Sequence, residues 1–342
     1  MTKKLKKAYY LAPACASLVL ILGLLYYFLL SDFSRCTETV YVCIDEDDTA
    51  DSLYAKLEPI ATNHGLTGLH TFVSHSSMKE KLHTGRYAIE PGMSTFTLFR
   101  HLKNGRQTPL RLTIPEVRTM DRLAAYLGQK LMMDSASVEQ ALTSEEVCRK
   151  LGYDTLNIPA LFVPNTYEVY WNITVDAFLK RMVKEHDAFW NYERRHKADL
   201  HGLSINEVCV LASIIDEETS NNQEKPMIAG MYMNRLKEGM PLQADPTVKF
   251  ALGDFSIRRI YQNMLRVESP YNTYMNTGLP PGPIKIASVK GIDAVLNRAS
   301  HDFLYMCAKE DFSGTHRFAR TYKEHKDNAA RYAKALNERN IR

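Results

Sequence analysis

Three consecutive acids, Asp216, Glu217 and Glu218, directly follow the apolar run at residues 208–215. This run, preceded by the capping residue Ser204, predicts a helix over residues 205–218 that is buried on most sides. Helical spacing places Glu218 on the apolar face and Asp216 on the opposite side. Since burial disfavours the carboxylate and raises its pKa, Glu218 is a candidate general acid, for example toward a glycosidic oxygen.

A simpler interpretation of the same acids is the solvated end of a helix. Acidic side chains at a helix C-terminus oppose the helix dipole. The pattern therefore indicates either a loss of helix stability that is accepted for function or a helix that continues past Glu218. Helix geometry alone leaves both interpretations open.

Five segments in order along the chain carry a family resemblance. They are residues 211–219, 229–236, 239–247, 269–274 and 278–284. In order and spacing they resemble the active-site segment and the segments after it in the endolytic murein transglycosylases, the YceG-like family. The resemblance extends from the N-terminal apolar run to the C-terminus and is densest over residues 211–325.

This resemblance implies a non-hydrolytic cut between N-acetylmuramic acid and N-acetylglucosamine in peptidoglycan. In the family, O6 of the muramic acid attacks its own anomeric carbon and leaves a 1,6-anhydro end. One glutamate acts as acid and then as base, unlike ordinary glycosidases with two carboxylates. Glu218 occupies the family's catalytic position. Asp216 stands where the family usually has Glu, which matters little if Asp216 points away.

Side chains elsewhere in the chain suit sugar hydroxyl and N-acetyl groups. The predicted substrate-binding residues are Gln243, Asp245, Tyr271, Asn272, Thr273, Asn234, Asn165 and His316. Asn165 replaces the carboxylate of a similar family string, which argues against a required second acid there. His316 and His325 lie in strings similar to family ones, and no third ligand stands out for a metal. Local structure is the alternative for each, such as a helix surface for Asn234 or a cap for Asp245.

Residues 9–30 are uncharged and predict a single transmembrane helix. At the helical rise this run is long enough for a bilayer core of roughly 30 Å. Four lysines within residues 3–7 predict that residues 1–8 are a cytoplasmic tail, by the positive-inside rule. The alternative is a cleaved signal peptide, but no clear small-residue cleavage site follows Leu30.

The remaining sequence predicts an α+β fold. Strands are expected at residues 39–44, 85–89, 110–114 and 303–308, and helices at 50–63, 95–103, 119–131, 138–151, 175–198, 205–218, 225–237 and from 322 onward. The resemblance implies that residues 39–108 form a LysM-like membrane-proximal domain. It also implies that residues 109–342 form the YceG-like catalytic domain.

The net charge and the cysteine positions narrow the range of functions that the sequence allows. A formal net charge of +4 over 342 residues is too small to indicate nucleic-acid binding. None of the six cysteines forms a CxxC pair, and no metal or other cofactor is predicted. Cys36 and Cys43 flank the first strand and could pair on an oxidising side of the membrane. Cys209, in the apolar helix, is interpreted as a core residue.

The combined prediction is a single-pass lyase of the bacterial inner (cytoplasmic) membrane with its catalytic domain on the outer, periplasmic side. The resemblance implies that it cuts nascent glycan strands and terminates their elongation, with penicillin-binding proteins of the elongation machinery as partners. One rival is a muramidase that hydrolyses with Asp245 or Glu217 as a second acid. The other is a non-catalytic peptidoglycan-binding scaffold.

Overall fold

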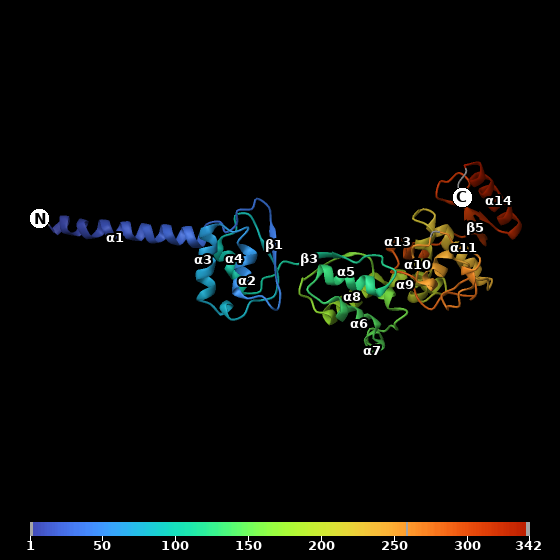
Figure 1. The fold of residues 1–342 in the computed structure, drawn as a ribbon, viewed down its shortest axis with the longest axis horizontal. Helices are drawn as coiled ribbons and strands as arrows, with labels where there is room; N and C mark the ends of the chain where they lie inside the picture. Colours follow the sequence, from blue (N-terminus) through green and yellow to red (C-terminus); the bar gives the residue numbers. More distant parts are fainter. Residues whose placement is uncertain (1–2, 258, 340–342) are drawn as a thin grey trace. The chain divides into compact units, whose positions relative to one another are not determined.

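A computed structural model describes residues 3–257 and 259–339, which divide into two compact units. Unit 1 extends to Leu112 and includes Lys130–Met132 and Glu168–Ile173. Unit 2 comprises Thr113–Gln129, Met133–Tyr167 and the chain from Thr174 onward. The fold mixes helices with small two-stranded sheets, in agreement with the α+β class (Figure 1).

The N-terminal part of unit 1 is a long apolar helix. Helix α1 (Lys3–Leu25) continues into a π-helical turn, η1 (Tyr26–Leu30). The segment Leu11–Leu30 is long and apolar enough to cross a membrane, and none of it is buried. Helices α9 (Tyr192–Leu200) and α10 (Ile205–Glu218) pass the same test only as one segment bent by 80°. Residues 208–215 of α10 are buried in the protein interior, so we interpret α10 as a core helix.

The rest of unit 1 packs helices beside one antiparallel hairpin. Strand β1 (Val40–Ile44) pairs with β2 (Gly85–Ile89), with Val40 opposite Ile89. The helical elements are α2 (Ala50–Leu57), α3 (Asn63–Ser74), η2 (Ser77–Lys79) and α4 (Thr95–Lys103). Apolar side chains such as Leu53, Leu69 and Leu98 form its core. The single helix predicted over residues 50–63 was wrong, because α2 ends at Leu57 and Thr62 caps a separate helix, α3.

Unit 2 contains most of the helices. They are α5 (Met120–Lys130, whose last residue belongs to unit 1), α6 (Ser135–Thr143), α7 (Glu145–Lys150), η3 (Ile158–Leu161), α8 (Val175–Phe189), α9, α10, α11 (Lys225–Lys237), α12 (Asp245–Leu252), η4 (Met264–Arg266), α13 (Val289–Leu296) and α14 (Tyr322–Glu338). Strand β3 (Leu110–Thr113) pairs with β4 (Thr166–Val169); Leu110–Leu112 and Glu168–Val169 of these strands belong to unit 1. Within unit 2, β5 (Tyr305–Ala308) pairs antiparallel with β6 (His316–Ala319). Helices α12 and α13 and strands β4 and β6 were not predicted.

Two predicted helices are each split in the structure by a new cap. The helix expected over residues 138–151 is interrupted at Ser144, whose hydroxyl accepts the Val147 N–H and starts α7. The helix expected over residues 175–198 is interrupted after Trp190, which is buried, and Asn191 caps α9. Hydrophobic periodicity continued through both breaks, whereas local side-chain hydrogen bonds ended the helices.

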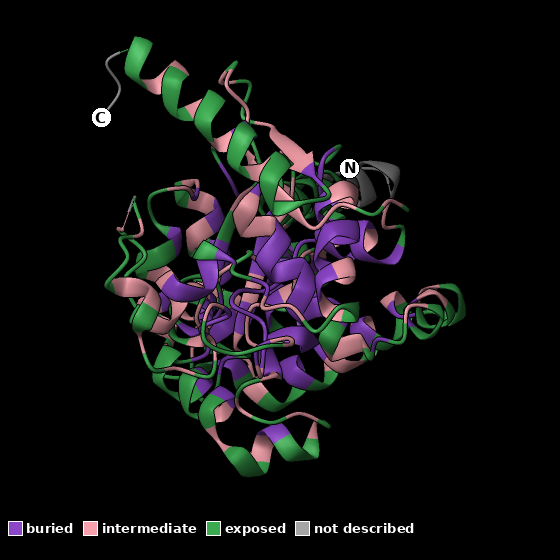
Figure 2. Cartoon of the chain, turned by 90° about the vertical axis from the view of Figure 1, so that its right-hand side faces the viewer, coloured by how far each residue is buried: buried purple, intermediate pink, exposed green. Residues whose placement is uncertain are grey.

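Helix α10 lies at the centre of unit 2. It contacts α11, α12 and α13, and its apolar residues belong to the main hydrophobic core. Buried residues gather in the middle of the unit, whereas α14 is largely exposed (Figure 2). Cys209 is buried in this core, as predicted. All six cysteines, Cys36 and Cys43 included, are free thiols in the described structure.

Candidate active site

Helix α10 holds the three acids at its C-terminal end. At its start, the Ser204 hydroxyl accepts the Glu207 N–H at 3.2 Å, and the Glu207 carboxylate accepts the Ser204 N–H at 2.8 Å. This capping box satisfies two backbone donors that the helix leaves unpaired. Inside the core, the Ser213 hydroxyl donates to Val210 O and accepts the Ile284 N–H at 3.0 Å, which ties the chain at Ile284 to the helix. The helix ends at Glu218.

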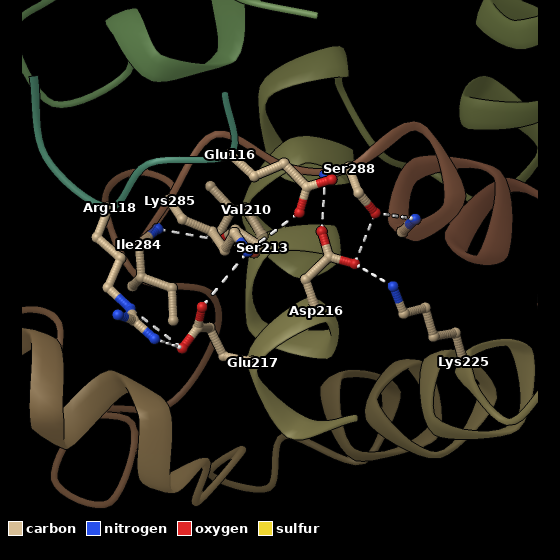
Figure 3. Close-up of polar contacts among 11 residues, drawn as sticks. Glu116, Arg118, Val210, Ser213, Asp216, Glu217, Lys225, Ile284, Lys285 and Ser288 are labelled. Atoms are coloured by element: carbon tan, nitrogen blue, oxygen red, sulfur yellow. Dashed lines mark hydrogen bonds and ion pairs between the residues drawn. The ribbon is translucent and has the colours of Figure 1, made fainter. Parts of the chain in front are cut away.

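Asp216 lies in a buried polar cluster (Figure 3). Its carboxylate accepts hydrogen bonds from Lys225 Nζ at 2.6 Å, from the Ser288 N–H at 2.7 Å and from the Ser288 hydroxyl at 2.8 Å. Only 2% of the Asp216 side chain is exposed. Gly291 leaves room for it, because a Cβ at that position would lie 2.6 Å from Asp216 Oδ1. Asp216 thus links α10 to the first turns of α11 and α13.

Glu217 points to a second set of charges, also visible in Figure 3. It forms an ion pair with Arg118 at 2.6 Å and lies 3.5 Å from Lys285 Nζ, which in turn contacts Glu116 at 3.2 Å. These bonds connect α10 with the residues before α5. Two of the three consecutive acids therefore have basic partners.

Glu218 lines a pocket with a volume of about 210 Å³. The other lining residues are Met231, Tyr232, Arg235, Leu242, Gln243, Asp245, Tyr274, Met306, Cys307, Ala308 and His316. They come from α11, from the segment before α12 and the first residue of α12, from the loop that contains Tyr274, and from the β5–β6 hairpin. The Tyr232 hydroxyl donates to Glu218 Oε1 at 2.7 Å.

The environment of Glu218 raises its pKa to about 7. Burial is the main cause, and the charge of Asp245 acts in the same direction. The hydrogen bond from Tyr232 and the positive charge of Lys249 oppose it, and His316 acts in the same direction when its ring is protonated. The raised pKa agrees with the expectation drawn from the apolar face of the helix. Such a carboxyl group is partly protonated near neutral pH and can both give and take a proton.

Gln243 and Asp245 form one side of the pocket. Gln243 has φ 50°, a left-handed conformation that is uncommon outside glycine. Its N–H donates to Thr273 O at 3.0 Å, and Arg235 donates to Leu242 O at 2.9 Å, so neighbouring hydrogen bonds hold the segment. The Tyr274 hydroxyl donates to Asp245 Oδ1 at 2.6 Å. Strained backbone held in this way is common at functional sites.

Five of the eight predicted substrate-binding residues do not line this pocket, and each contacts protein atoms instead. Asn272 is fully buried and donates to Leu265 O and Val267 O. The Thr273 hydroxyl accepts the Ala244 N–H, and the Tyr271 ring packs on Phe250 with centroids 4.7 Å apart. Asn234 donates to His301 O and Phe303 O, at 2.8 and 3.0 Å. These contacts favour the local-structure alternative, and sugar binding by these side chains stays a prediction.

Asn165 also lies outside the pocket. It is exposed just before β4, and its side-chain oxygen accepts the Thr166 N–H at 2.8 Å. His316, by contrast, lines the pocket and contacts Glu224, while His325 stacks on Tyr305 with centroids 5.4 Å apart. Among the residues described, no group of three His, Cys, Asp or Glu side chains could hold a metal ion.

Sequence reasoning did not identify Tyr232, Arg235 or Glu224 as site residues. Tyr232 and Arg235 belong to the segment 229–236 and lie one turn apart on α11, which was a usable signal. Glu224 had no signal, because its contact with His316 joins residues 92 positions apart.

The family model described as the YceG-like family matches residues 42–331. The chain belongs to the YceG-like family. Among curated relatives, it is 29% identical to the endolytic murein transglycosylase of Bacillus subtilis (strain 168), over 75% of this chain and 74% of that protein. It is 27% identical to the endolytic murein transglycosylase of Streptococcus pneumoniae (strain D39), over 86% of this chain and 58% of that protein.

A solved structure supports the YceG-like fold. The crystal structure of a yceG-like protein from Listeria monocytogenes is 26% identical and superposes with a TM-score of 0.56. The match covers 85% of this chain and 99% of the Listeria chain. The likeness therefore includes most of the described helices and strands.

Proposed function

We propose that this YceG-like protein is an endolytic murein transglycosylase, a lyase that cuts peptidoglycan glycan strands. The proposal rests on the position of Glu218 in the pocket and on its raised pKa. Glu218 is the one acid of residues 216–218 that lines the pocket, and its pKa is about 7. The names of the Bacillus and Streptococcus relatives support the same activity.

The proposed reaction uses Glu218 twice. The Tyr232 hydroxyl donates to Oε1, so in the protonated acid the proton resides on Oε2. Glu218 gives this proton to the glycosidic oxygen between N-acetylmuramic acid and N-acetylglucosamine as that bond breaks. The muramic acid O6 bonds to its own anomeric carbon, and the Glu218 carboxylate takes the O6 proton. The product carries a 1,6-anhydro end, no water is consumed, and Glu218 returns to its acid form.

Gln243, Asp245 and His316 are the predicted substrate-binding residues best placed for contact with the sugar, because they line the same pocket as Glu218. Gln243 offers an amide and Asp245 a carboxylate, both suited to hydroxyl and N-acetyl groups. Sugar contact by Asn234, Asn272 and Thr273 requires rearrangement of hydrogen bonds that these side chains now make. Tyr271 and Asn165 lie outside the lining of this pocket.

A hydrolytic muramidase is the second candidate, because Asp245 lies in the same pocket as Glu218. A pair of carboxylates that flank the scissile bond is the usual arrangement of glycosidases. Glu217, the other acid considered for this role, is paired with Arg118 and lies outside the pocket lining.

The deciding experiment is cleavage of purified glycan strands in ¹⁸O-labelled water, followed by mass analysis of the new ends. Transglycosylation gives 1,6-anhydro ends without ¹⁸O. Reducing ends that carry ¹⁸O would establish the muramidase instead. Strand binding without any new ends, in a folded protein, would support the non-catalytic scaffold.

The proposed setting is the bacterial inner membrane. Leu11–Leu30 supports a single-pass anchor, and the lysines before it support a cytoplasmic tail at residues 1–8. Residues 39–108 are proposed as a LysM-like glycan-binding domain and residues 109–342 as the catalytic domain. Penicillin-binding proteins are the proposed partners, since the site would act on strands that they extend.

A further inference from the structure

Glu224 is a buried acid beside the pocket. It directly precedes α11, yet its side chain does not cap that helix. Only 8% of the residue is exposed. Both carboxylate oxygens face His316: Oε1 accepts the backbone N–H at 2.6 Å, and Oε2 lies 2.9 Å from the ring Nδ1. The whole carboxylate is therefore directed at one residue of the pocket wall.

This contact fixes where the His316 ring carries its hydrogen. An ionised carboxylate can only accept hydrogen bonds, so Nδ1 must be the donor. The neutral ring then has its lone pair on Nε2. Within the described part of the chain, Nε2 has no hydrogen-bond partner, and 17% of the side chain is exposed at the pocket.

The same contact holds the pocket wall in place. His316 begins β6 and lies opposite Ala308 of β5, and Met306, Cys307 and Ala308 of β5 line the pocket. Glu224 itself is held by a hydrogen bond of 3.0 Å from its N–H to Asn221 O. Through Glu224, the turn between α10 and α11 thereby holds His316, the first residue of β6, in place.

His316 also faces the charges around Glu218. The groups that act on Glu218 are Tyr232 from α11, Asp245 and Lys249 from α12, and His316 from β6. Lys249 lowers the Glu218 pKa, against burial and Asp245, and His316 does so only when its ring is protonated. A displaced His316 ring would therefore change the pocket surface beside Glu218.

We propose that Glu224 is a positioning residue, which holds His316 as the Nδ1–H tautomer and so presents Nε2 as a hydrogen-bond acceptor for a sugar hydroxyl in the Glu218 pocket. This inference rests on the proposed function for the identity of the ligand. It adds a role for Glu224, and it assigns the chemistry by which His316 would bind the glycan.

The sharpest variant is Glu224→Gln in the full-length protein. The side-chain oxygen of the new Gln can still accept the backbone N–H of His316. Its amide NH₂ would then face the ring Nδ1 and donate a hydrogen bond to it. The ring proton should move to Nε2, which becomes a donor. In ¹⁵N-histidine NMR spectra, with the His316 signals identified from their loss in His316→Ala, wild type should show the Nδ1–H tautomer and Glu224→Gln the Nε2–H tautomer.

Affinity for uncleaved glycan strands gives the functional readout. It is measured in the Glu218→Gln background, where turnover does not interfere. Glu224→Gln and His316→Ala should each weaken binding by up to about tenfold, the worth of one ordinary hydrogen bond. The matched control is Glu310→Gln, which removes an ion pair with Arg317 in the β5–β6 hairpin without touching the pocket lining. It should leave affinity unchanged.

A double variant separates positioning from general stability. Glu224→Gln should cause no further loss of affinity once His316 is Ala. An equal loss in both backgrounds, or a wild-type ring that carries its proton on Nε2, would overturn the proposal. Neither result depends on cleavage, so a failure here is distinct from failure of the proposed reaction, which only the ¹⁸O experiment tests.

Discussion

The two sides of the C-terminal end of α10 carry the same kind of side chain in opposite environments. On one side, Asp216 and Glu217 meet Lys225, Arg118 and Lys285. On the other, Glu218 meets a tyrosine hydroxyl and the charge of Asp245. Basic partners favour a carboxylate, whereas desolvation and a second acid favour the neutral carboxyl. The neighbouring groups, and not the residue type, therefore distinguish a structural acid from a proton-transfer acid.

The largest difference between the two sides should appear in catalysis. Glu218→Gln removes the only proton-transfer group that we assign and should lower the rate of anhydro-end formation by about 10²- to 10⁴-fold. Glu217→Gln, the matched neighbour on the same helix, should retain cleavage. Equal losses in the two variants, with both proteins folded, would remove the distinction. Rates are measured from mass-resolved ends on purified strands.

Asp216 should matter mainly for stability. Asp216→Ala leaves Lys225 charged and buried, with 7% of that side chain exposed, and also removes the acceptor of the Ser288 N–H. Breaking a buried pair from one side typically costs about 3–5 kcal/mol. The measurement is the free energy of unfolding in urea. The double replacement Asp216→Leu with Lys225→Met should recover part of the loss, and a single-variant loss below about 0.5 kcal/mol would contradict the buried cluster.

The pH dependence should distinguish Glu218 from its neighbours. Its folded pKa of about 7 lies above the reference value of 4.5, so its contribution to stability is fully present below about pH 4.5 and is lost as pH rises through 7. Unfolding free energies of wild type and Glu218→Gln should therefore diverge across this window, with the variant more stable at pH 8. Parallel curves would contradict the raised pKa.

Cleavage should follow the same titration. The acid form of Glu218 protonates the leaving oxygen, and its population falls above pH 7. We therefore expect kcat/KM to decline on the alkaline side of neutrality. Glu217→Gln should leave the position of this limb unchanged, because Glu217 lies outside the pocket lining.

The smallest effect should come from the Glu217 ion pair. The Arg118 side chain is 43% exposed and that of Glu217 is 17% exposed, so the pair is partly solvated and should contribute about 1 kcal/mol. Glu217→Gln should lower the free energy of unfolding by no more than this, and less at high salt. A loss of unfolding free energy as large as that of Asp216→Ala would show that Glu217 behaves as a buried ion-pair partner.

Much of the local structure was predictable. The bounds of α4, α10, α11 and β2 follow from caps, glycines and hydrophobic periodicity. Errors arose where a cap interrupts a continuous pattern, as at Ser144 and Asn191. Helix α12 begins with Asp245-Pro246, and Pro is favourable in the first turn, so that helix was within reach of the sequence.

In the candidate site, too, local features were predictable and contacts between distant residues were not. The sequence predicted that Glu218 ends a buried helix and that burial raises its pKa, because helical spacing and apolar neighbours are local properties, but it left a solvated helix end as the alternative. Packing of the helices and strands brings Lys225 and Arg118 to the adjacent acids, the Tyr232 hydroxyl to Glu218, and Glu224 to His316, 92 residues away. These contacts depend on how helices and strands pack, and no local pattern encodes which side chains then meet.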